Sequence, residues 1–217
     1  MIISLSVYAN DIYINQSGAT LDLDITQDGQ NYTVGSSSTA SSVIGATTNL
    51  AITQIGDSNV MTFDVNGANY TGTFSVTGNT NNIDFNCDSG GSNSSCGTAT
   101  ASIVWVGSSN DIDIDIGETS SATGATVSIT GASGSDSNTI LGTIDGNSAI
   151  LTLSVNGDTN NFLVDIDGNG DSVGHTYIHT HTGSIADVDI TQSGIYDNMI
   201  TLTTSGDNAD IDIIQRD

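Results

Sequence analysis

The sequence has almost no positive charge, no proline and few aromatic residues. Its 217 residues include one Lys or Arg against 25 Asp or Glu, which gives a formal net charge of −24, and 5% are aromatic. Nucleic-acid binding needs clustered cations that displace the counterions of the phosphates, so this composition excludes it. The same charge disfavours docking on anionic lipid. The chain also lacks a run of about 18 apolar residues, so the sequence predicts no membrane insertion.

Stretches of strong helix formers are scarce too, which indicates an all-β chain. High net charge with few aromatics is typical of disorder. However, 36% of the residues are hydrophobic, and Ile, Val and Leu alternate with polar residues. Alternation with a period of two predicts strands that each bury one face.

Two features favour an oxidising, extracellular or cell-surface location. Cys87 and Cys96 bracket one short polar loop, which indicates a disulfide rather than a metal pair. Residues 1–9 end in Val7-Tyr8-Ala9, a small-x-small pattern that resembles a signal-peptidase site. The basic region and the full apolar core of a signal peptide are missing, so we interpret the segment as a remnant signal peptide. A first strand over Ile2–Tyr8 is the alternative.

Glycine recurs at intervals of 11 residues. Such intervals separate Gly18 from Gly29, and Gly56 from Gly67. Each glycine follows an alternating apolar run, and an Asn or Asp stands two or three positions later in most copies; these residues tolerate the positive φ of tight turns. The predicted turn glycines are Gly18, Gly29, Gly56, Gly67, Gly78, Gly157, Gly168 and Gly194.

A unit of 11 residues suits either an antiparallel sandwich or a solenoid. A sandwich has no reason to repeat one chemical signature at a fixed offset, whereas each coil of a solenoid meets a nearly identical coil. The sequence therefore predicts a two-sheet β-solenoid in which two 11-residue strand–turn halves form a rung of about 22 residues. Inward amides would pair with their equivalents one rung away. This predicted stacking ladder consists of Gln16, Gln27, Gln54, Asn59, Gln192 and Gln215.

One repeat unit resembles a known family. Gln54-x-Gly56-x-x-Asn59-x-Met61 is similar to the curlin repeat of bacterial amyloid fibre subunits, Gln-x-Gly-x-x-Asn-x-Ala, and Gln192-x-Gly194 and Gln16-x-Gly18 are looser matches. The chain departs from the family in its larger apolar residues and in usually lacking the second Gln. The resemblance implies a secreted, self-assembling β-solenoid of a biofilm-matrix or adhesion fibre, with a secretion or nucleation partner.

The repeats divide the chain into blocks. After the remnant signal peptide at 1–9, curlin-like repeats cover residues 10–83 and 140–217. The segment 84–139 is irregular and contains the predicted disulfide loop. The sequence leaves open whether this middle segment continues the solenoid with decorations or caps it.

Aspartates alternate with Ile, Val or Leu, so we expect them on the outer face. The clearest runs are Asp111-Asp113-Asp115, Asp187-Asp189, Asp210-Asp212 and Asp22-Asp24. A solubilising face adapted to salt is one interpretation, and dedicated sites or a paired-carboxylate hydrolase are others. No nucleophile elbow or phosphate loop is present, so we do not expect an enzyme.

Two segments are candidate metal sites, although no cofactor is required. Asp165, Asp167, Asn169 and Asp171 resemble the start of an EF-hand calcium loop, but Thr176 stands where that family needs Glu. A plain Asp/Asn/Gly turn is the alternative. His179 and His181 point to one strand face and suit zinc, nickel or iron, in a pattern similar to the tips of phage fibres. A stacked polar pair is the alternative there.

Threonine pairs with the spacing Thr-x-Thr, such as Thr98/Thr100 and Thr201/Thr203, resemble the flat faces of ice-binding solenoids. They do not recur at the repeat period, so the sequence alone gives little support for such a face.

The prediction is a structural protein that stacks end to end with copies of itself into an extracellular curli-like fibre. The alternative is a metal- or glycan-binding appendage, as in a phage fibre or a surface adhesin, with a β-solenoid body.

Overall fold

The computed structural model describes residues 11–35, 40–87, 98–117, 124–132, 134–146, 148–167, 175–194 and 198–216. Within these ranges the protein consists of sixteen strands joined by turns and loops, with no helix. Consequently, these ranges hold no helix that is long and apolar enough to cross a membrane. The remnant signal peptide predicted at residues 1–9 lies outside the described residues.

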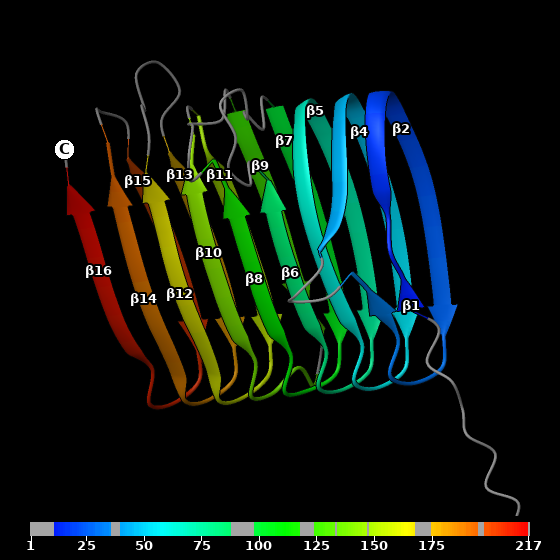
Figure 1. Cartoon of the computed structure of the whole chain (residues 1–217). Coiled ribbons are helices and arrows are strands. Elements are labelled where there is room, and N and C mark those ends of the chain that lie inside the picture. The colour runs from blue at the N-terminus through cyan, green and yellow to red at the C-terminus, as the bar shows by residue number, and fades with distance from the viewer. Residues whose placement is uncertain are drawn as a thin grey trace, which may run out of the picture.

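The strands form two stacked sheets (Figure 1). The front sheet contains β1 (Asp11–Ile12), β3 (Thr33–Val34), β6 (Asn82–Cys87), β8 (Asp111–Ile116), β10 (Thr139–Asp145), β12 (Asn160–Asp167), β14 (Ala186–Ser193) and β16 (Asp210–Arg216). The back sheet contains β7 (Thr98–Val106), β9 (Gly124–Gly131), β11 (Ile150–Asn156), β13 (Thr176–Thr182) and β15 (Met199–Ser205). Three longer strands contribute to both sheets: β2 (Asn15–Asp28), β4 (Ser41–Ile55) and β5 (Val60–Thr77).

Every strand pair is parallel, and the chain winds from one sheet to the other and back, so the predicted β-solenoid is confirmed. Some rungs have the expected length: Asn59 meets its equivalent Asn81 after 22 residues, and Asn138 meets Asn160 after 22. Other rungs are longer, and Asn81 is 29 residues from Asn110. The register is kept across this variation because residues are added between strands rather than within them.

The space between the sheets is a continuous hydrophobic core. Inward side chains of β8 such as Ile112 and Ile114 are buried, whereas the alternating aspartates of that strand face outward. Beside two large core side chains, Trp105 and Tyr70, a glycine on a neighbouring strand or in the same strand leaves room for the ring. A Cβ on Gly131 would lie 2.4 Å from Cζ2 of Trp105, and one on Gly72 would lie 2.0 Å from the Tyr70 hydroxyl.

The middle segment 84–139 does not form a cap. Its strands β7, β8 and β9 occupy successive positions in the same two sheets as the repeats on either side. What makes the sequence irregular there is the length of the connections between strands, which pushes the glycine spacing away from 11 residues.

The two edges of the solenoid differ, and the predicted turn glycines fall into two classes. At the lower edge in Figure 1, tight turns lead from the back sheet to the front sheet, and Gly29, Gly56 and Gly78 have φ of 148°, 129° and 142° there. A second left-handed residue follows two positions later, for example Ser58 with φ 62°. Gly157 lies in an equivalent turn, where a Cβ would come within 2.4 Å of the Ser135 carbonyl oxygen.

The prediction that Gly18 and Gly67 stand in turns is wrong. They lie inside β2 and β5, at the upper corner where these strands bend from the front to the back sheet without a break. Gly45 stands between them in the stack, and a Cβ on Gly67 would be 2.0 Å from the Gly45 carbonyl oxygen. Gly194 follows β14 with φ 132° on the front-to-back connection. Gly168 lies outside the described residues.

Candidate functional site

A ladder of asparagines runs along the lower edge, at the position where five successive turns enter the front sheet. The Asn110 side-chain oxygen accepts the backbone N–H of Asn81 at 2.9 Å and the Asn81 amide at 3.0 Å. Its own amide donates to the Gly107 carbonyl at 2.9 Å and to Asn138 at 3.1 Å. All five asparagines are buried, and together they satisfy the polar groups of the turns: Asn59, Asn81, Asn110, Asn138 and Asn160.

The predicted glutamine ladder exists as two separate pairs. In the back sheet, Gln54 donates to Gln27 at 2.9 Å. In the front sheet, Gln215 donates to Gln192 at 3.3 Å. The neighbouring positions of these two rows are apolar, with Val76 next to Gln54 and Ile166 next to Gln192. Within one molecule Gln16 has no glutamine beside it, since its partner one rung away is Val43. Asn59 stacks on Asn81 in the asparagine ladder and not on a glutamine.

The histidines lie in the core near the C-terminal end and not on the surface. His179 and His181 do face the same way, but that way is inward, and both are buried. Their ring centroids are 6.4 Å apart and the rings are nearly perpendicular, at 88°. The Tyr177 hydroxyl is 2.7 Å from Nδ1 of His179, and Nε2 of His181 is 2.8 Å from the Gly157 carbonyl oxygen. Each of these rings is therefore held by one hydrogen bond and packed edge-on against Phe162.

Burial has an electrostatic consequence for His179. Desolvation and, to a smaller extent, the neighbouring His181 lower its pKa to about 4. The imidazole is therefore neutral at physiological pH. Nε2 of His179 and Nδ1 of His181 have no hydrogen-bond partner. Both rings are buried, and among the described residues no third His, Cys, Asp or Glu joins them in a group that could hold a metal ion, so the metal site predicted at these histidines is not supported by their position.

The calcium prediction is only partly within the described residues. Asp165 and Asp167 project outward from β12, whereas Asn169 and Asp171 lie outside the described residues. Burial and the charge of Asp167 raise the pKa of Asp165. In the part of the chain that the structure describes, no three His, Cys, Asp or Glu side chains come together in a way that could hold a metal ion.

Carboxylates concentrate on the outer face of the front sheet, which we call the acidic face. It is defined by Asp64, Asp84, Asp111, Asp113, Asp115, Asp145, Asp165, Asp167, Asp187, Asp189, Asp210 and Asp212. Several of them meet another carboxylate one rung away, as Asp189 meets Asp212. Burial, followed by the charges of Asp64 and Asp111, raises the pKa of Asp84. The predicted outward placement of the aspartate runs is confirmed.

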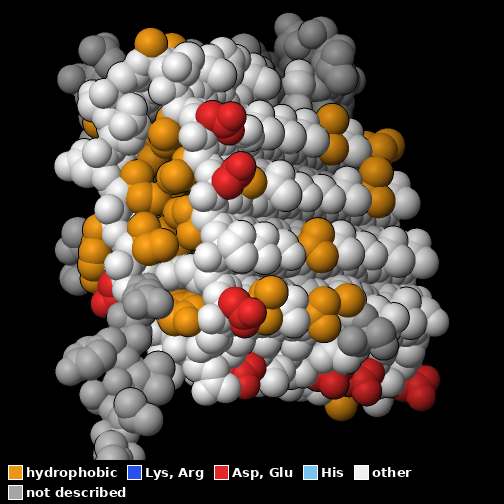
Figure 2. Space-filling model, turned by 90° about the vertical axis from the view of Figure 1, so that its right-hand side faces the viewer, with side chains coloured by type: hydrophobic (Ala, Val, Ile, Leu, Met, Phe, Trp, Pro, Cys, Tyr) orange, Lys and Arg blue, Asp and Glu red, His pale blue; other side chains and the backbone are white. Residues whose placement is uncertain are grey.

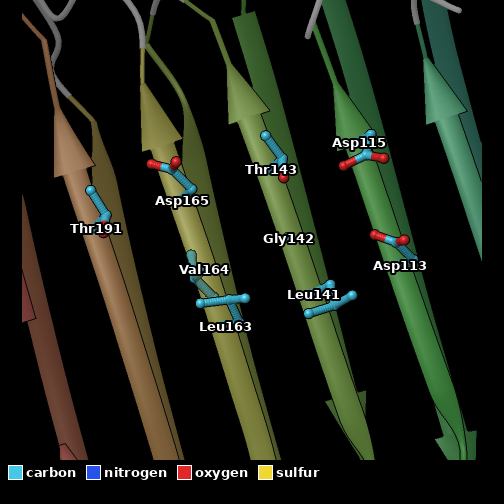
Figure 3. Close-up of a pocket in the computed structure, with 9 residues that line it drawn as sticks. All are labelled: Asp113, Asp115, Leu141, Gly142, Thr143, Leu163, Val164, Asp165 and Thr191. Carbon is cyan, nitrogen blue, oxygen red and sulfur yellow. The ribbon is translucent and has the colours of Figure 1, made fainter. Parts of the chain in front are cut away.

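A shallow hollow of about 360 Å³ lies on the acidic face (Figure 3). Asp113 and Asp115 of β8 line it on one side and Asp165 of β12 on the other. Leu141 of β10 and Leu163 of β12 are paired across neighbouring strands and complete its lining. The carboxylates stand on separate strands and do not converge on one point (Figure 3). This arrangement attracts counterions to the whole face, but it does not build a single coordination site.

The structure describes one of the two cysteines of the predicted disulfide. Cys87 is buried at the end of β6 and is disulfide-bonded. Cys96, its predicted partner, lies outside the described residues.

The two end rungs leave inward-facing side chains exposed. At the C-terminal end, Ile213 of β16 is 45% exposed, whereas Ile190, which precedes it in the same row, is 1% exposed. Ile211 is 36% exposed, against 0% for Val188 one rung earlier. At the N-terminal end, Ile12, Ile14, Leu21 and Leu23 are only partly buried. Each end also presents strand edges whose backbone groups have no neighbouring strand among the described residues.

These end rungs match each other row by row. If β15 and β16 of one copy were placed beneath β2 and β1 of the next, each inward row would continue. The front-sheet rows would join Ile211 to Ile12, Ile213 to Ile14 and Gln215 to Gln16. The back-sheet rows would join Ile200 to Leu23, Leu202 to Ile25 and Thr204 to Gln27.

Sequence reasoning missed most of the asparagine ladder and found only Asn59. A usable signal was present, because Gly56, Gly78 and Gly107 are each followed by Asn three residues later. The varying rung length hid it from a search at a fixed period.

Comparison of the chain with family models, curated proteins and solved structures found no match.

Proposed function

We propose that this protein is a secreted structural protein that stacks end to end, through its open rungs, into an extracellular curli-like fibre for matrix or adhesion. The observation that carries the proposal is the match between the inward rows of the first and last described rungs. It puts apolar side chains on apolar side chains and Gln215 on Gln16. The curlin-like repeat and the disulfide at Cys87 support the family resemblance and an oxidising location.

The energetics favour such stacking. Joining two copies would remove the exposed apolar side chains of both end rungs from water, and full burial of one Ile or Leu side chain contributes about 1.5–3 kcal/mol. It would also pair the backbone groups of both strand edges, which in β-proteins are ready templates for further strands. The proposed polymer is a continuation of the contacts that already hold rung to rung inside one molecule.

The alternative, a metal- or glycan-binding appendage, has less support. His179 and His181 are packed in the core, and the aspartates of the acidic face stand apart. Aromatic side chains that could stack on sugar rings also point inward in the described strands, as Tyr70, Phe74 and Trp105 do.

The decisive experiment blocks stacking at the C-terminal end of the solenoid. In the variant I211K/I213K two ammonium groups occupy the inward rows of the last strand, where a second copy would have to bury them. The matched control, T203K/I214K, adds the same charge to the outward side of the last rung. We expect fibres with a meridional reflection of about 4.7 Å from the parent and the control, and monomers from I211K/I213K. Monomers from the parent under all salt conditions would overturn the proposal, as would fibres from I211K/I213K.

The register can be tested separately. In parallel neighbouring strands, Cα atoms of paired residues are about 4.8 Å apart, within the range that a disulfide spans. The variant Q16C/Q215C should therefore form disulfide-linked chains of many copies under oxidation. The variant Q16C/R216C, whose second thiol points outward, should not. Equal crosslinking of both variants would show that the copies do not stack in this register.

A further inference from the structure

The outer face of the back sheet is chemically unlike the acidic face. Its outward side chains are mostly threonine and serine, and Figure 2 shows them as parallel rows on a flat surface. We call this surface the hydroxyl face. From β4 to β15 it comprises Thr47, Thr53, Thr71, Thr73, Ser75, Thr77, Thr98, Thr100, Ser102, Thr126, Ser128, Thr130, Thr152, Ser154, Thr176, Thr180, Thr182, Thr201, Thr203 and Ser205.

The hydroxyl groups form a regular array although the sequence spacing is irregular. The register places Thr71 opposite Thr100 and Thr100 opposite Thr126. In the next row Thr73 is followed by Ser102 and Ser128. Rows therefore repeat about every 4.8 Å from rung to rung, and alternate residues of a strand repeat about every 6.8 Å. The sequence-based judgement that the Thr-x-Thr pairs do not recur is corrected, because the extra residues of longer rungs do not enter these strands.

The hydroxyl face is also nearly free of charge. Among the described strands of the back sheet, outward carboxylates occur only in β2, at Asp22, Asp24 and Asp28 (Figure 2). All the other positions hold hydroxyls, amides, glycine or aliphatic groups such as Val104 and Ile178. Carboxylates bind liquid water strongly, and the molecule has gathered them on the opposite face. A ligand for the hydroxyl face therefore has no net charge, and it has to be flat and periodic over many rungs.

We propose that the hydroxyl face binds the surface of ice. A threonine offers one hydroxyl, which both donates and accepts hydrogen bonds, and one methyl group that leaves nearby water ordered. An array of such groups with repeats of about 4.8 Å and about 6.8 Å is close to the oxygen repeats on a prism plane of hexagonal ice. Waters held at these positions would belong to the protein surface and to the crystal lattice at once. Sugar polymers fit less well, since no aromatic side chain is part of this face in the described strands.

The interior of the protein keeps the hydroxyl face flat. Flat sheets of many strands are unusual and need specific side-chain ladders to hold them. The asparagine ladder ties five successive turns together at one edge, and the strands run nearly parallel across the sheet (Figure 1). A rigid array loses little entropy when it binds a lattice. This property does not depend on end-to-end stacking, which would only lengthen the array.

The test compares the two faces in the monomeric I211K/I213K background and in the parent chain. Thermal hysteresis and partition into a growing ice hemisphere are measured for T100Y/T126Y, which places two large rings on the hydroxyl face. The matched control T143Y/T191Y places the same rings on the acidic face. We expect hysteresis and ice enrichment for the unmodified face, a loss of at least fivefold in T100Y/T126Y, and no change in T143Y/T191Y. Tyrosine is a good strand residue, and circular dichroism verifies the fold.

A second pair of variants keeps the test decisive should the rings disturb folding. T100D/T126D places carboxylates in the row where Asp22 stands naturally, and it should also abolish ice binding. V104T/V106T completes a strand of the array and should raise hysteresis. The proposal is overturned if the parent shows no hysteresis and no more ice enrichment than a soluble acidic protein, or if variants of the two faces behave alike. Either result leaves the fibre experiments unaffected.

Discussion

Each inward asparagine of the ladder satisfies several polar groups of the turn at the same time. The Asn160 oxygen accepts the backbone N–H and the side-chain amide of Asn138, both at 3.0 Å. The Asn160 amide donates to the Gly157 carbonyl at 2.8 Å. A buried polar group left without a partner costs about 1–3 kcal/mol. The ladder therefore allows a tight, buried turn to repeat in rung after rung.

The variant N160A tests this role. It leaves the backbone N–H of Asn138 without its partner and removes the amide that donates to the Gly157 carbonyl, which keeps its contact with Nε2 of His181. We therefore expect a loss of about 1–3 kcal/mol in the free energy of unfolding. Asn161 follows directly and points outward, so N161A is the matched control and should change stability by less than about 0.5 kcal/mol. Urea denaturation followed by circular dichroism gives both values. Equal effects would show that the ladder contributes little to stability.

His179 makes stability depend on pH. Its pKa is about 4 in the folded protein and about 6.5 when unfolded. Because the unfolded chain takes up the proton first as pH falls, this residue contributes stability above pH 6.5 that is lost between about pH 6.5 and pH 4. The lost contribution is about 3 kcal/mol.

The comparison needs a variant that keeps the packing. H179L/Y177F places leucine between Leu153 and Leu202 in the same row and removes the tyrosine hydroxyl that would lose its partner. We expect the difference in unfolding free energy between the variant and Y177F to grow by about 3 kcal/mol from pH 7 to pH 4. A difference that is constant with pH would mean that His179 is accessible to protons in the folded state.

Ile185 is a strained residue in an otherwise regular turn. Its φ is 58°, in the left-handed region, where Asn31 and Asn208 stand in the equivalent turns at 59° and 62°. A β-branched residue there costs about 1–3 kcal/mol, and the side chain is 54% exposed, so little packing would be lost. We expect I185N to stabilise the protein by about 1 kcal/mol and S184N, at a position outside the left-handed region, to leave it unchanged. Thermal denaturation measures both, and a destabilised I185N would contradict the prediction.

At the scale of elements, the long strands and the short ones use different ways to pass from the front to the back sheet. β2, β4 and β5 bend at a stack of three glycines, Gly18, Gly45 and Gly67, where each backbone lies directly on the next. From β6 onward the strands end, and a separate connection leads to the back sheet. The bend requires close backbone contact, so it has no room for a side chain.

Two glycine-to-alanine variants compare a glycine that has no room for a Cβ atom with one that has room. In G67A the new Cβ would lie 2.0 Å from the Gly45 carbonyl oxygen, and the backbone would have to move. In G142A the nearest heavy atom is Leu151 Cδ2 at 3.7 Å, an ordinary contact. We expect G67A to lose more than about 3 kcal/mol and G142A to gain about 0.5–1 kcal/mol through reduced freedom of the unfolded chain. Similar unfolding midpoints for both would show that the corner is loosely packed.

Considered as a whole, the molecule is a flat solenoid with one charged and one neutral broad face. On the acidic face, carboxylates in neighbouring rungs are separated by about 4.8 Å, at which distance two unit charges repel by about 1 kcal/mol in bulk water. Salt should therefore stabilise each molecule and speed the assembly of copies.

A salt titration tests this account of the acidic face. Between about 0.01 M and about 1 M salt the Debye length falls from about 30 Å to about 3 Å, so the unfolding midpoint of the parent should rise. D187N/D189N, which removes the repulsion with Asp210 and Asp212, should show a weaker dependence on salt. D22N/D24N changes the charge equally, but its neighbours are Asn49 and Ala51, so its dependence should match the parent. Identical slopes for all three would contradict the proposed repulsion.

The fold could be predicted because its signal is local and repeated. Alternation of Ile and Asp in β8 fixes which side chains enter the core, and the Gly–Asn turns fix where the chain reverses. The inward direction of His179 also follows from alternation, but its burial does not, because that depends on Phe162 and on the rungs on both sides. The hydroxyl face could not be predicted from a fixed period, since Thr71 and Thr100 are brought together by register across an insertion of unequal length.

The difference between the two edges has a practical consequence for engineering. The asparagine ladder ties the tight turns that it crosses closely together, whereas the longest connection between described strands leads to the back sheet, from Cys87 to Thr98. Peptides grafted into successive connections, between β8 and β9 and between β10 and β11 for example, would emerge from the same side of the scaffold. Their anchor points would be spaced by single rungs of about 4.8 Å. The protein could thus serve as a linear scaffold that displays grafted peptides at a spacing set by the hydrogen bonds between neighbouring strands.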